Sequence, residues 1–401
     1  MVVGGDGKLA LSWLAEPLAA ALAQQRGHAL LVHGSEGVGV LPFVLSLAQA
    51  WLCEADLCPQ AALPPPPEGD EQSGQATFAH VRPQAALPPP PEGDEQSGQA
   101  TFAHARSRAA GPCGRCGSCK LVQSHLHPDL QVLLPEQLRR EHDWLRIDDK
   151  IGGDEAKRKP SKQIRIDEVR SVIDWVFKTS ARGRGKVLVL HPAQALNQQS
   201  ANALLKTLEE PPPGTRIVLS CSDPVLLLPT VRSRCQHLRL PTPELAEATA
   251  WLQAQGVAEP EVLLAACSGR PLEAWALAQA GVLATHWQAL PGAVARGEPG
   301  ALQGWPLPRV LDALHKLCHD ALAAASGAPG RYFPQGSIGR GASVSALCAW
   351  SHELGRVARH DEHPWHEGLM LDALLAAGAR ALQASAATRT SNRPGFDTLP
   401  T

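Results

Sequence analysis

Short apolar runs alternate with helical patterns through the first 240 residues, and this alternation constrains the fold more than any other feature of the chain. Strands are expected at 28–34, 129–135, 186–191, 216–221 and 236–240, and helices at 11–24, 40–53, 166–178 and 200–210. In the helix at 166–178, the face expected in the core consists of Ile166, Val169, Val172, Ile173, Val176 and Phe177. Because strands joined through helices pair in parallel, the pattern predicts an α/β fold with a parallel sheet flanked by helices.

A glycine-rich loop follows the first predicted strand, where a nucleotide-binding protein would hold phosphate. Gly34 and Gly39 stand at the P-loop interval, between a strand and a helix. A working P-loop continues with a lysine for the phosphates and a hydroxyl for Mg²⁺, but here these positions are Val40 and Leu41. The strand at 186–191 also lacks the acidic pair that would hold the metal and poise water. We therefore expect this loop neither to bind nor to hydrolyse ATP.

Three cysteines lie at two successive CxxC intervals in the motif CGRCGSC, namely Cys113, Cys116 and Cys119. Structural zinc takes four such thiolates, so a fourth ligand must come from elsewhere, and Cys53 and Cys58 are the nearby candidates. Buried or redox-active cysteines without metal are one alternative. A catalytic zinc completed by His125 or His127 is another, but four thiolates leave no open position for water, which favours structural zinc.

A tandem duplication interrupts this region, since residues 59–82 recur at 83–106 with only Val81 replaced, by Ala105. Four consecutive prolines, acidic residues and Gly/Ser in each copy cannot bury an apolar face, so the segment 59–106 is expected to be a disordered insert. Beyond residue 240 the Ala/Leu/Trp segments between Gly and Pro predict an all-helical part. The Thr/Ser/Arg/Pro-rich tail is expected to be disordered.

Bulk composition excludes several functions. The 401 residues carry a net charge of −2, so the chain has no overall basic field that would hold DNA unaided. It shows neither a signal peptide pattern nor an uncharged apolar stretch long enough to span a membrane. We therefore expect a cytoplasmic protein without a membrane partner.

Several motifs together resemble the delta-prime family of the bacterial DNA polymerase III clamp loader, an AAA+ family. They are HALLVHGSEGVG, CGRCGSC, SHLHPDLQVLLPE, IDEVRSV, NQQSANALLKTLEEPPPGTRIVLSC and PTVRSRCQHLRL, within a match over roughly residues 11–285. The resemblance implies an AAA+ fold with an inactive nucleotide site, and structural zinc held by Cys53, Cys113, Cys116 and Cys119. The insert within the zinc module departs from the family pattern.

The SRC motif of this family falls on Ser233, Arg234 and Cys235. In clamp loaders the arginine reaches across a subunit interface to the γ-phosphate of ATP held by a neighbour, where a cation offsets developing charge. The resemblance therefore implies that Arg234 is an arginine finger acting in trans. Arg232 is close enough to be confused with it and ranks second.

The resemblance also predicts the domain organisation. An AAA+ domain is expected at 1–240, with the zinc module at 53–119 and the insert 59–106 inside it, followed by a small helical lid domain at 241–290, an all-helical collar domain for oligomerisation at 291–384 and the tail at 385–401. This organisation predicts a stator subunit that lacks its own ATPase and helps load the sliding clamp on primed DNA during replication.

The implied partners are the gamma/tau motor subunits, the delta subunit, the sliding clamp and primer-template DNA, and the implied location is the nucleoid-associated replisome. Two other functions compete with this one. An ATP-hydrolysing motor subunit of the same complex is opposed by Val40 and Leu41. A zinc-ribbon DNA-binding protein would need basic residues around the cysteines, and only Arg106, Arg108, Arg115 and Lys120 are available.

Overall fold

The computed structural model describes residues 3–24, 27–55, 111–142, 144, 160–360 and 366–383. The predicted insert at 59–106 and tail at 385–401 lie outside the described residues, as does Cys58. No helix among the described residues is both long and apolar enough to cross a membrane.

Five parallel strands form one sheet in the order β2-β3-β4-β1-β5, which confirms the predicted α/β fold. The strands are β1 (Ala29–His33), β2 (Leu130–Leu133), β3 (Lys186–Leu190), β4 (Thr215–Cys221) and β5 (Gln236–Arg239). Each predicted strand is present: β4 begins one residue earlier than predicted, and the other four are shorter by one to three residues. Central β1 pairs with β4 on one side and β5 on the other, so that Leu30 lies opposite Val218 and Gln236.

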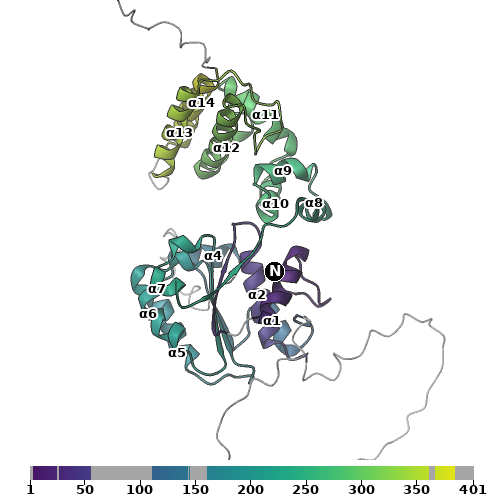
Figure 1. Cartoon of the computed structure of the whole chain (residues 1–401), viewed down its shortest axis with the longest axis vertical. Helices are drawn as coiled ribbons and strands as arrows, with labels where there is room; N and C mark the ends of the chain where they lie inside the picture. The colour runs from purple at the N-terminus through teal and green to yellow at the C-terminus, as the bar shows by residue number, and fades with distance from the viewer. Residues whose placement is uncertain are drawn as a thin grey trace, which may run out of the picture.

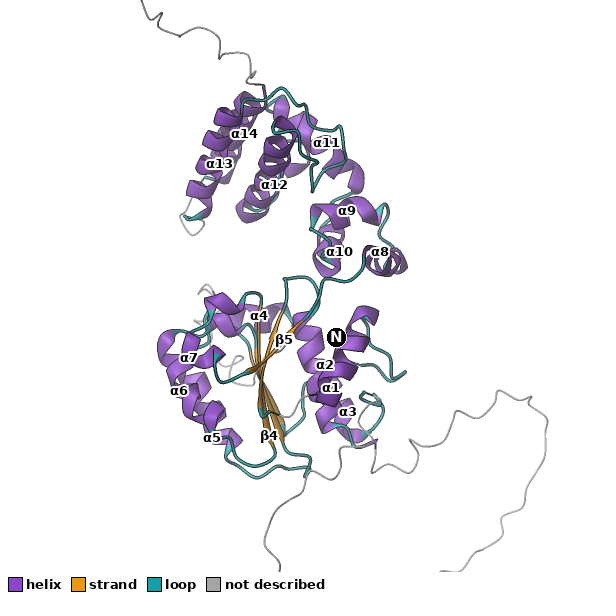
Figure 2. Ribbon diagram, viewed as in Figure 1, coloured by secondary structure: helices purple, strands orange, loops and turns teal. Residues whose placement is uncertain are grey.

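Helices cover both faces of the sheet, with α1, α2 and α3 on one side and α5, α6 and α7 on the other (Figure 2). Their bounds are α1 (Ala15–Gln24), after the 3₁₀ turn η1 (Ser12–Leu14), α2 (Val40–Leu52), α3 (Gly117–Gln123), α4 (Glu136–Glu141), α5 (Ile166–Val176), α6 (Gln198–Glu209) and α7 (Pro229–Arg232). Side chains alternate between the two faces along each strand: Leu30 and Val32 pack with α2, whereas Leu31 packs with α5 and α6. Each such fully buried side chain contributes about 1.5–3 kcal/mol.

One residue of the core face predicted for the helix at 166–178 is not buried. Helix α5 ends at Val176, and Phe177, its C-terminal cap, is 63% exposed rather than buried. Val169, Val172 and Val176 are buried as expected. The prediction failed at Phe177 because the apolar period was extended one residue beyond the end of the helix.

After β5, the elements of the described residues are helices and the loops that join them, as predicted. The helices are α8 (Leu245–Ala254), α9 (Pro260–Ala266), α10 (Pro271–Gln279), α11 (Ala284–Ala295), α12 (Leu307–Ala325), α13 (Val344–Ala358) and α14 (Glu367–Gln383), with a 3₁₀ turn η9 (Gly300–Leu302). Helices α8–α10 lie between the sheet and α11–α14 (Figure 1). The buried residues of all these helices belong to one apolar core, so the boundary expected near residue 290 stays a prediction.

Helices α8 and α10 contact the sheet part of the chain near the glycine loop. The indole of Trp251 donates a 3.1 Å hydrogen bond to the Ala10 carbonyl and meets the Trp13 ring edge-on, with 5.5 Å between centroids. The backbone N–H of Leu272 donates a 3.0 Å bond to the carbonyl of Gly37. The glycine loop is thus covered by the helical part that follows the sheet.

Candidate functional site

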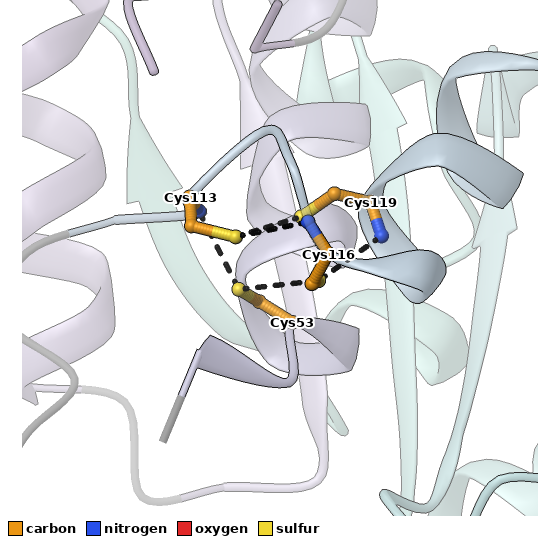
Figure 3. A group of neighbouring side chains, drawn as sticks. All are labelled: Cys53, Cys113, Cys116 and Cys119. Atoms are coloured by element: carbon orange, nitrogen blue, oxygen red, sulfur yellow. Dashed lines mark hydrogen bonds between the residues drawn. The ribbon is translucent and has the colours of Figure 1, made fainter. Parts of the chain in front are cut away.

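Four cysteine sulfurs converge beside the C-terminal end of α2 (Figure 3). Cys53 caps α2, while Cys113, Cys116 and Cys119 come from a tight turn and the first residues of α3. All four sulfur atoms lie within 4.8 Å of one another. Of the two candidates for the fourth ligand, the structure therefore brings Cys53 to the other three.

The spacing of these sulfurs fits a tetrahedral zinc ion. With Zn–S bonds of about 2.3 Å, the edge of the ligand tetrahedron is about 3.8 Å. The Cys53–Cys116 and Cys113–Cys119 sulfurs are each 3.9 Å apart. Backbone N–H groups of Glu54 and Cys119 donate to the Cys116 sulfur at 3.4 Å; burial has the larger effect and raises the pKa of Cys116, whereas these two bonds act in favour of the thiolate. The cluster can therefore hold a metal ion, consistent with structural zinc.

Electrostatics within the cluster already favours one thiolate. The Cys119 thiol, as the hydrogen-bonding neighbour, lowers the pKa of Cys53 to about 5, and the same bond together with burial raises the pKa of Cys119. Metal binding would extend this deprotonation to all four sulfurs, since the thiolate is the ligand form.

The turn that carries the cysteines depends on a glycine. Gly114 has a φ of +71°, and a Cβ there would lie 1.8 Å from the carbonyl oxygen of Gly4. The N-terminal segment continues along the cluster, where Gln123 donates from its side-chain amide to the carbonyls of Val3 and Gly114. Only glycine therefore permits the close approach of the two backbones that closes the cluster on this side.

Two arginines before β3 attach the cluster to the sheet, and no spacing in the sequence pointed to them. Arg184 donates from Nε and Nη2 to the carbonyl of Cys53 at 3.0 and 2.5 Å. Arg182 pairs with Glu54 at 2.8 Å and donates to Ser118 Oγ at 2.9 Å. The Arg182 guanidinium holds the pKa of Glu54 below its usual range. The contacts with Cys53 and Glu54 span more than a hundred residues of sequence, so they become visible only in the fold.

The two histidines that could complete a catalytic zinc site, His125 and His127, contact other residues instead. His127 contacts Ser118 Oγ through Nε2 at 3.1 Å and accepts the Asp129 N–H at Nδ1. Burial lowers the pKa of His127. His125 stacks on Trp144 with 3.7 Å between ring centroids. Neither ring belongs to the group of potential ligands among the described residues.

The glycine loop leads from β1 into α2 and is packed with apolar groups. Gly39 has a φ of +100°, and a Cβ there would come within 2.6 Å of Leu11. A Cβ on Gly34 would lie 3.1 Å from Leu240. Val40 and Leu41, at the lysine and hydroxyl positions, are 7% and 9% exposed in the same apolar core. The loop offers hydrocarbon where a nucleotide site offers charge.

Across the sheet, the residues after β3 carry no carboxylate. His191 contacts Ser220 Oγ through Nδ1 at 2.9 Å, and burial lowers the pKa of its ring to about 4. Gln194 donates to Ser222 Oγ at 3.0 Å. A neutral imidazole and an amide can neither hold Mg²⁺ as a carboxylate does nor act as the acidic partner of an attacking water.

Arg234 lies at the amino-terminal ends of the strands (the amino edge of the sheet), whereas the loop lies at their carboxyl-terminal ends (the carboxyl edge). It stands two residues before β5, and β5 runs parallel to β1, whose carboxyl end leads into Gly34. Since Gln236 is level with Leu30, Arg234 and Gly34 are separated along the strands by at least about 13 Å. Arg234 therefore cannot serve the glycine loop of its own chain.

The SRC turn is held by contacts with α6, α7 and the residues just before α7. Arg234 pairs with Glu209, at the end of α6, and donates from Nη1 to the Thr230 carbonyl at 2.8 Å. Cys235 is buried, with its thiol donating to Val231, and Ser233 is exposed. The Arg232 side chain turns to the Pro224 carbonyl at 3.4 Å. The sequence did not predict the contact between Glu209 and Arg234, although Glu209 lies in the quoted run NQQSANALLKTLEEPPPGTRIVLSC.

Comparison with known proteins agrees with the resemblance carried by these motifs. Residues 96–244 match a family model described as DNA polymerase III, delta subunit. The chain is 38% identical over 187 residues to DNA polymerase III subunit delta' of Pseudomonas aeruginosa, covering 46% of this chain and 50% of that protein. It is 35% identical over 181 residues to subunit delta' of Escherichia coli, covering 44% and 46%.

The chain also has a shorter stretch of sequence similarity to a different subunit. It is 36% identical over 80 residues to DNA polymerase III subunit gamma of Buchnera aphidicola, covering 20% of this chain and 22% of that protein. The chain thus spans about half the length of the delta' relatives named above. The resemblance to the DNA polymerase III delta-prime family is confirmed.

Proposed function

We propose that this chain, a relative of the DNA polymerase III delta-prime subunits, is the stator subunit of a clamp loader. It leaves ATP hydrolysis to neighbouring motor subunits and presents Arg234 to the ATP that one of them holds. A guanidinium there would neutralise charge that develops on the transferred phosphate. The chain would in this way help to load the sliding clamp on primed DNA without an ATPase of its own.

One observation carries the proposal: the two candidate nucleotide features lie at opposite edges of one parallel sheet. The carboxyl edge, with the glycine loop, is filled by Leu11, Leu240 and the buried Val40. The amino edge presents a partly exposed arginine in a family motif. An arginine on that edge can act only on a nucleotide that another chain holds.

The remaining parts have supporting roles in this proposal. Zinc on the four cysteines would fix the turn before α3 against α2, with Arg182 and Arg184 fastening it to the sheet. Helices α8–α10 would form the lid domain and α11–α14 the collar that joins the ring of subunits. The partners would be gamma/tau and delta subunits, with the clamp and primer-template DNA reached through the complex, in the cytoplasm at the replicating chromosome.

The test is reconstitution of this chain with motor and delta subunits of its own organism, followed by measurement of DNA-stimulated ATP turnover. Arg234→Ala is expected to lower kcat with little change in the KM for ATP, because the interaction forms in the transition state. Arg232→Ala is the matched control, two residues away and directed to Pro224. Equal turnover by the Arg234→Ala and unaltered complexes would refute the trans role.

The lone chain provides a separate test of the inactive loop. The 80-residue match to a gamma subunit favours the motor alternative as the rival function. We expect no Mg·ATP binding by the purified chain in equilibrium dialysis. Tight binding with turnover that disappears on Gly39→Val would support the motor function instead.

A further inference from the structure

The arginine of the SRC turn is held in a defined position by a neighbouring helix. Helix α6 ends at Glu209, directly before Glu210 and Pro211, and it packs against α7, which leads into the turn (Figure 1). The Oε1 atom of Glu209 accepts a 2.5 Å hydrogen bond from Nε of Arg234 and forms an ion pair with Nη2. Nη1 donates to the Thr230 carbonyl at 2.8 Å. The guanidinium is therefore fixed from two sides, by a side chain and by the backbone.

We infer that Glu209 is a positioning residue for Arg234. The inference rests on the proposed function, because it assigns Glu209 a role only if Arg234 acts on a neighbour's nucleotide. An arginine side chain has four rotatable bonds, and fixing it on binding consumes rotamer entropy of about 2 kcal/mol. A carboxylate that orients the guanidinium beforehand removes part of this cost from the step at which ATP is hydrolysed.

The pattern of contacts positions the guanidinium without using it up. Of its five N–H groups, Glu209 accepts the one on Nε and pairs with Nη2, and Thr230 accepts one on Nη1. Beyond these contacts, one N–H on each terminal nitrogen is left for another acceptor. Two N–H groups on adjacent nitrogens suit two phosphate oxygens, as in bidentate phosphate recognition.

The strength of the pair also suits positioning rather than blocking. The Arg234 and Glu209 side chains are 33% and 47% exposed, so water screens their attraction. A pair this exposed contributes little to stability, and Glu209 does not outcompete the several negative charges of a nucleoside triphosphate for the guanidinium. Orientation, rather than folding energy, is what Glu209 supplies.

The chain contains a matched control for this role. Glu210 follows Glu209 in the sequence and is likewise exposed. Within the part of the chain that the structure describes, no ion pair or hydrogen bond joins Glu210 to Arg234. Replacing either glutamate removes one negative charge from the same edge of the sheet, but only Glu209 contacts the guanidinium.

The experiment compares Glu209→Ala, Glu209→Gln and Glu210→Ala, alone and combined with Arg234→Ala, in the reconstituted clamp loader. Glu209→Ala is expected to lower kcat for DNA-stimulated ATP hydrolysis by about 3- to 30-fold, since a misplaced group loses up to about 100-fold per ångström. Glu209→Gln, which keeps an acceptor, should fall between Glu209→Ala and the unaltered complex. Glu210→Ala should leave kcat unchanged, and none of the variants should alter assembly of the complex.

Combination with Arg234→Ala separates positioning from a general structural effect. If Glu209 acts through Arg234, its replacement lowers kcat no further once the arginine is gone. Additive losses, or a Glu209→Ala rate equal to or above the unaltered rate while Arg234→Ala is slow, would overturn the inference and leave the proposed function standing. Unchanged turnover by Arg234→Ala alone would instead overturn the proposed function.

Discussion

Two adjacent arginines in α4 provide a controlled comparison of a buried and an exposed ion pair. Arg139 and Arg140 each have a nitrogen 2.5 Å from a glutamate oxygen, of Glu168 and Glu136 respectively. The side chains of the first pair are 2% and 13% exposed, whereas those of the second are 43% and 22% exposed. Distance is therefore held constant, and burial is what differs.

The magnitudes follow from what each substitution leaves behind. Arg139→Ala removes a fully buried side chain that also donates to the Leu134 carbonyl at 2.9 Å, and it leaves the Glu168 carboxylate without its guanidinium. Breaking a buried pair costs about 3–5 kcal/mol, and we expect about 3 kcal/mol because Glu168 regains some water and keeps the N–H of Arg165. Arg140→Ala should cost about 0.3–0.5 kcal/mol.

The assay is urea unfolding of both variants, followed by native-state hydrogen exchange of the α5 amides. The exchange measurement is included because a chain with several folded parts need not unfold in one step. Arg139→Ala should shift the transition and raise exchange in α5, where Glu168 lies, while Arg140→Ala should change neither measurably. If the two variants lose equal stability, burial is not what sets the strength of these pairs, and the argument fails.

Three further predictions concern the cysteine cluster, the loop and the lid contact. Native mass spectrometry is expected to find one zinc per chain. Cys116→Ser should release it, with loss of part of the roughly 10–16 kcal/mol typical of such sites, whereas Cys318→Ser, at an isolated buried cysteine, should retain it. Retention of zinc by both variants would argue against the site. Val40→Lys with Leu41→Thr should destabilise the chain by about 3 kcal/mol without creating ATP turnover, because a charge enters an apolar core; measurable hydrolysis would contradict this. In α10, burial raises the pKa of the Glu273 carboxyl to about 7, so its stabilising contribution is full below pH 4.5 and lost as the pH rises through 7. Glu273→Gln should remove up to about 1 kcal/mol of this pH dependence. If the slope of Tm between pH 5.5 and 8 is the same in this variant as in the unaltered chain, the prediction is refuted.

The strands and most helix positions were predictable because they follow from local periodicity. The apolar run at 187–190 has no polar face and must be buried on both sides, which only an inner strand of a covered sheet allows. Phe177 shows the limit of the same reasoning. Periodicity identifies a face but not the residue at which the helix ends, and α5 ends at Val176.

The candidate site was predictable where ligands are close in sequence and unpredictable where they are not. Two CxxC intervals constrain three sulfurs locally, but spacing alone left Cys53 and Cys58 equivalent as the fourth ligand. Cys53 reaches the cluster because it caps α2 at a fixed place on the sheet. The Glu209–Arg234 pair depends on how α6 packs against α7, and no spacing rule encodes that packing.

On the proposed function, the polarity of the parallel sheet explains how a subunit could lack a nucleotide site of its own and still act on the nucleotide of a neighbour. Phosphate loops form at the carboxyl edge of such a sheet, where strands lead into helix N-termini, whereas Arg234 lies before a strand, at the amino edge. The length of the strands separates the edges, so substitutions at Val40 and Leu41 do not disturb the SRC turn. Those two side chains also join the apolar core, so restoring a lysine there costs stability before it restores any chemistry. On the proposed function, the apolar residues of the loop serve stability, and Arg234 is the part of the chain that acts on a nucleotide.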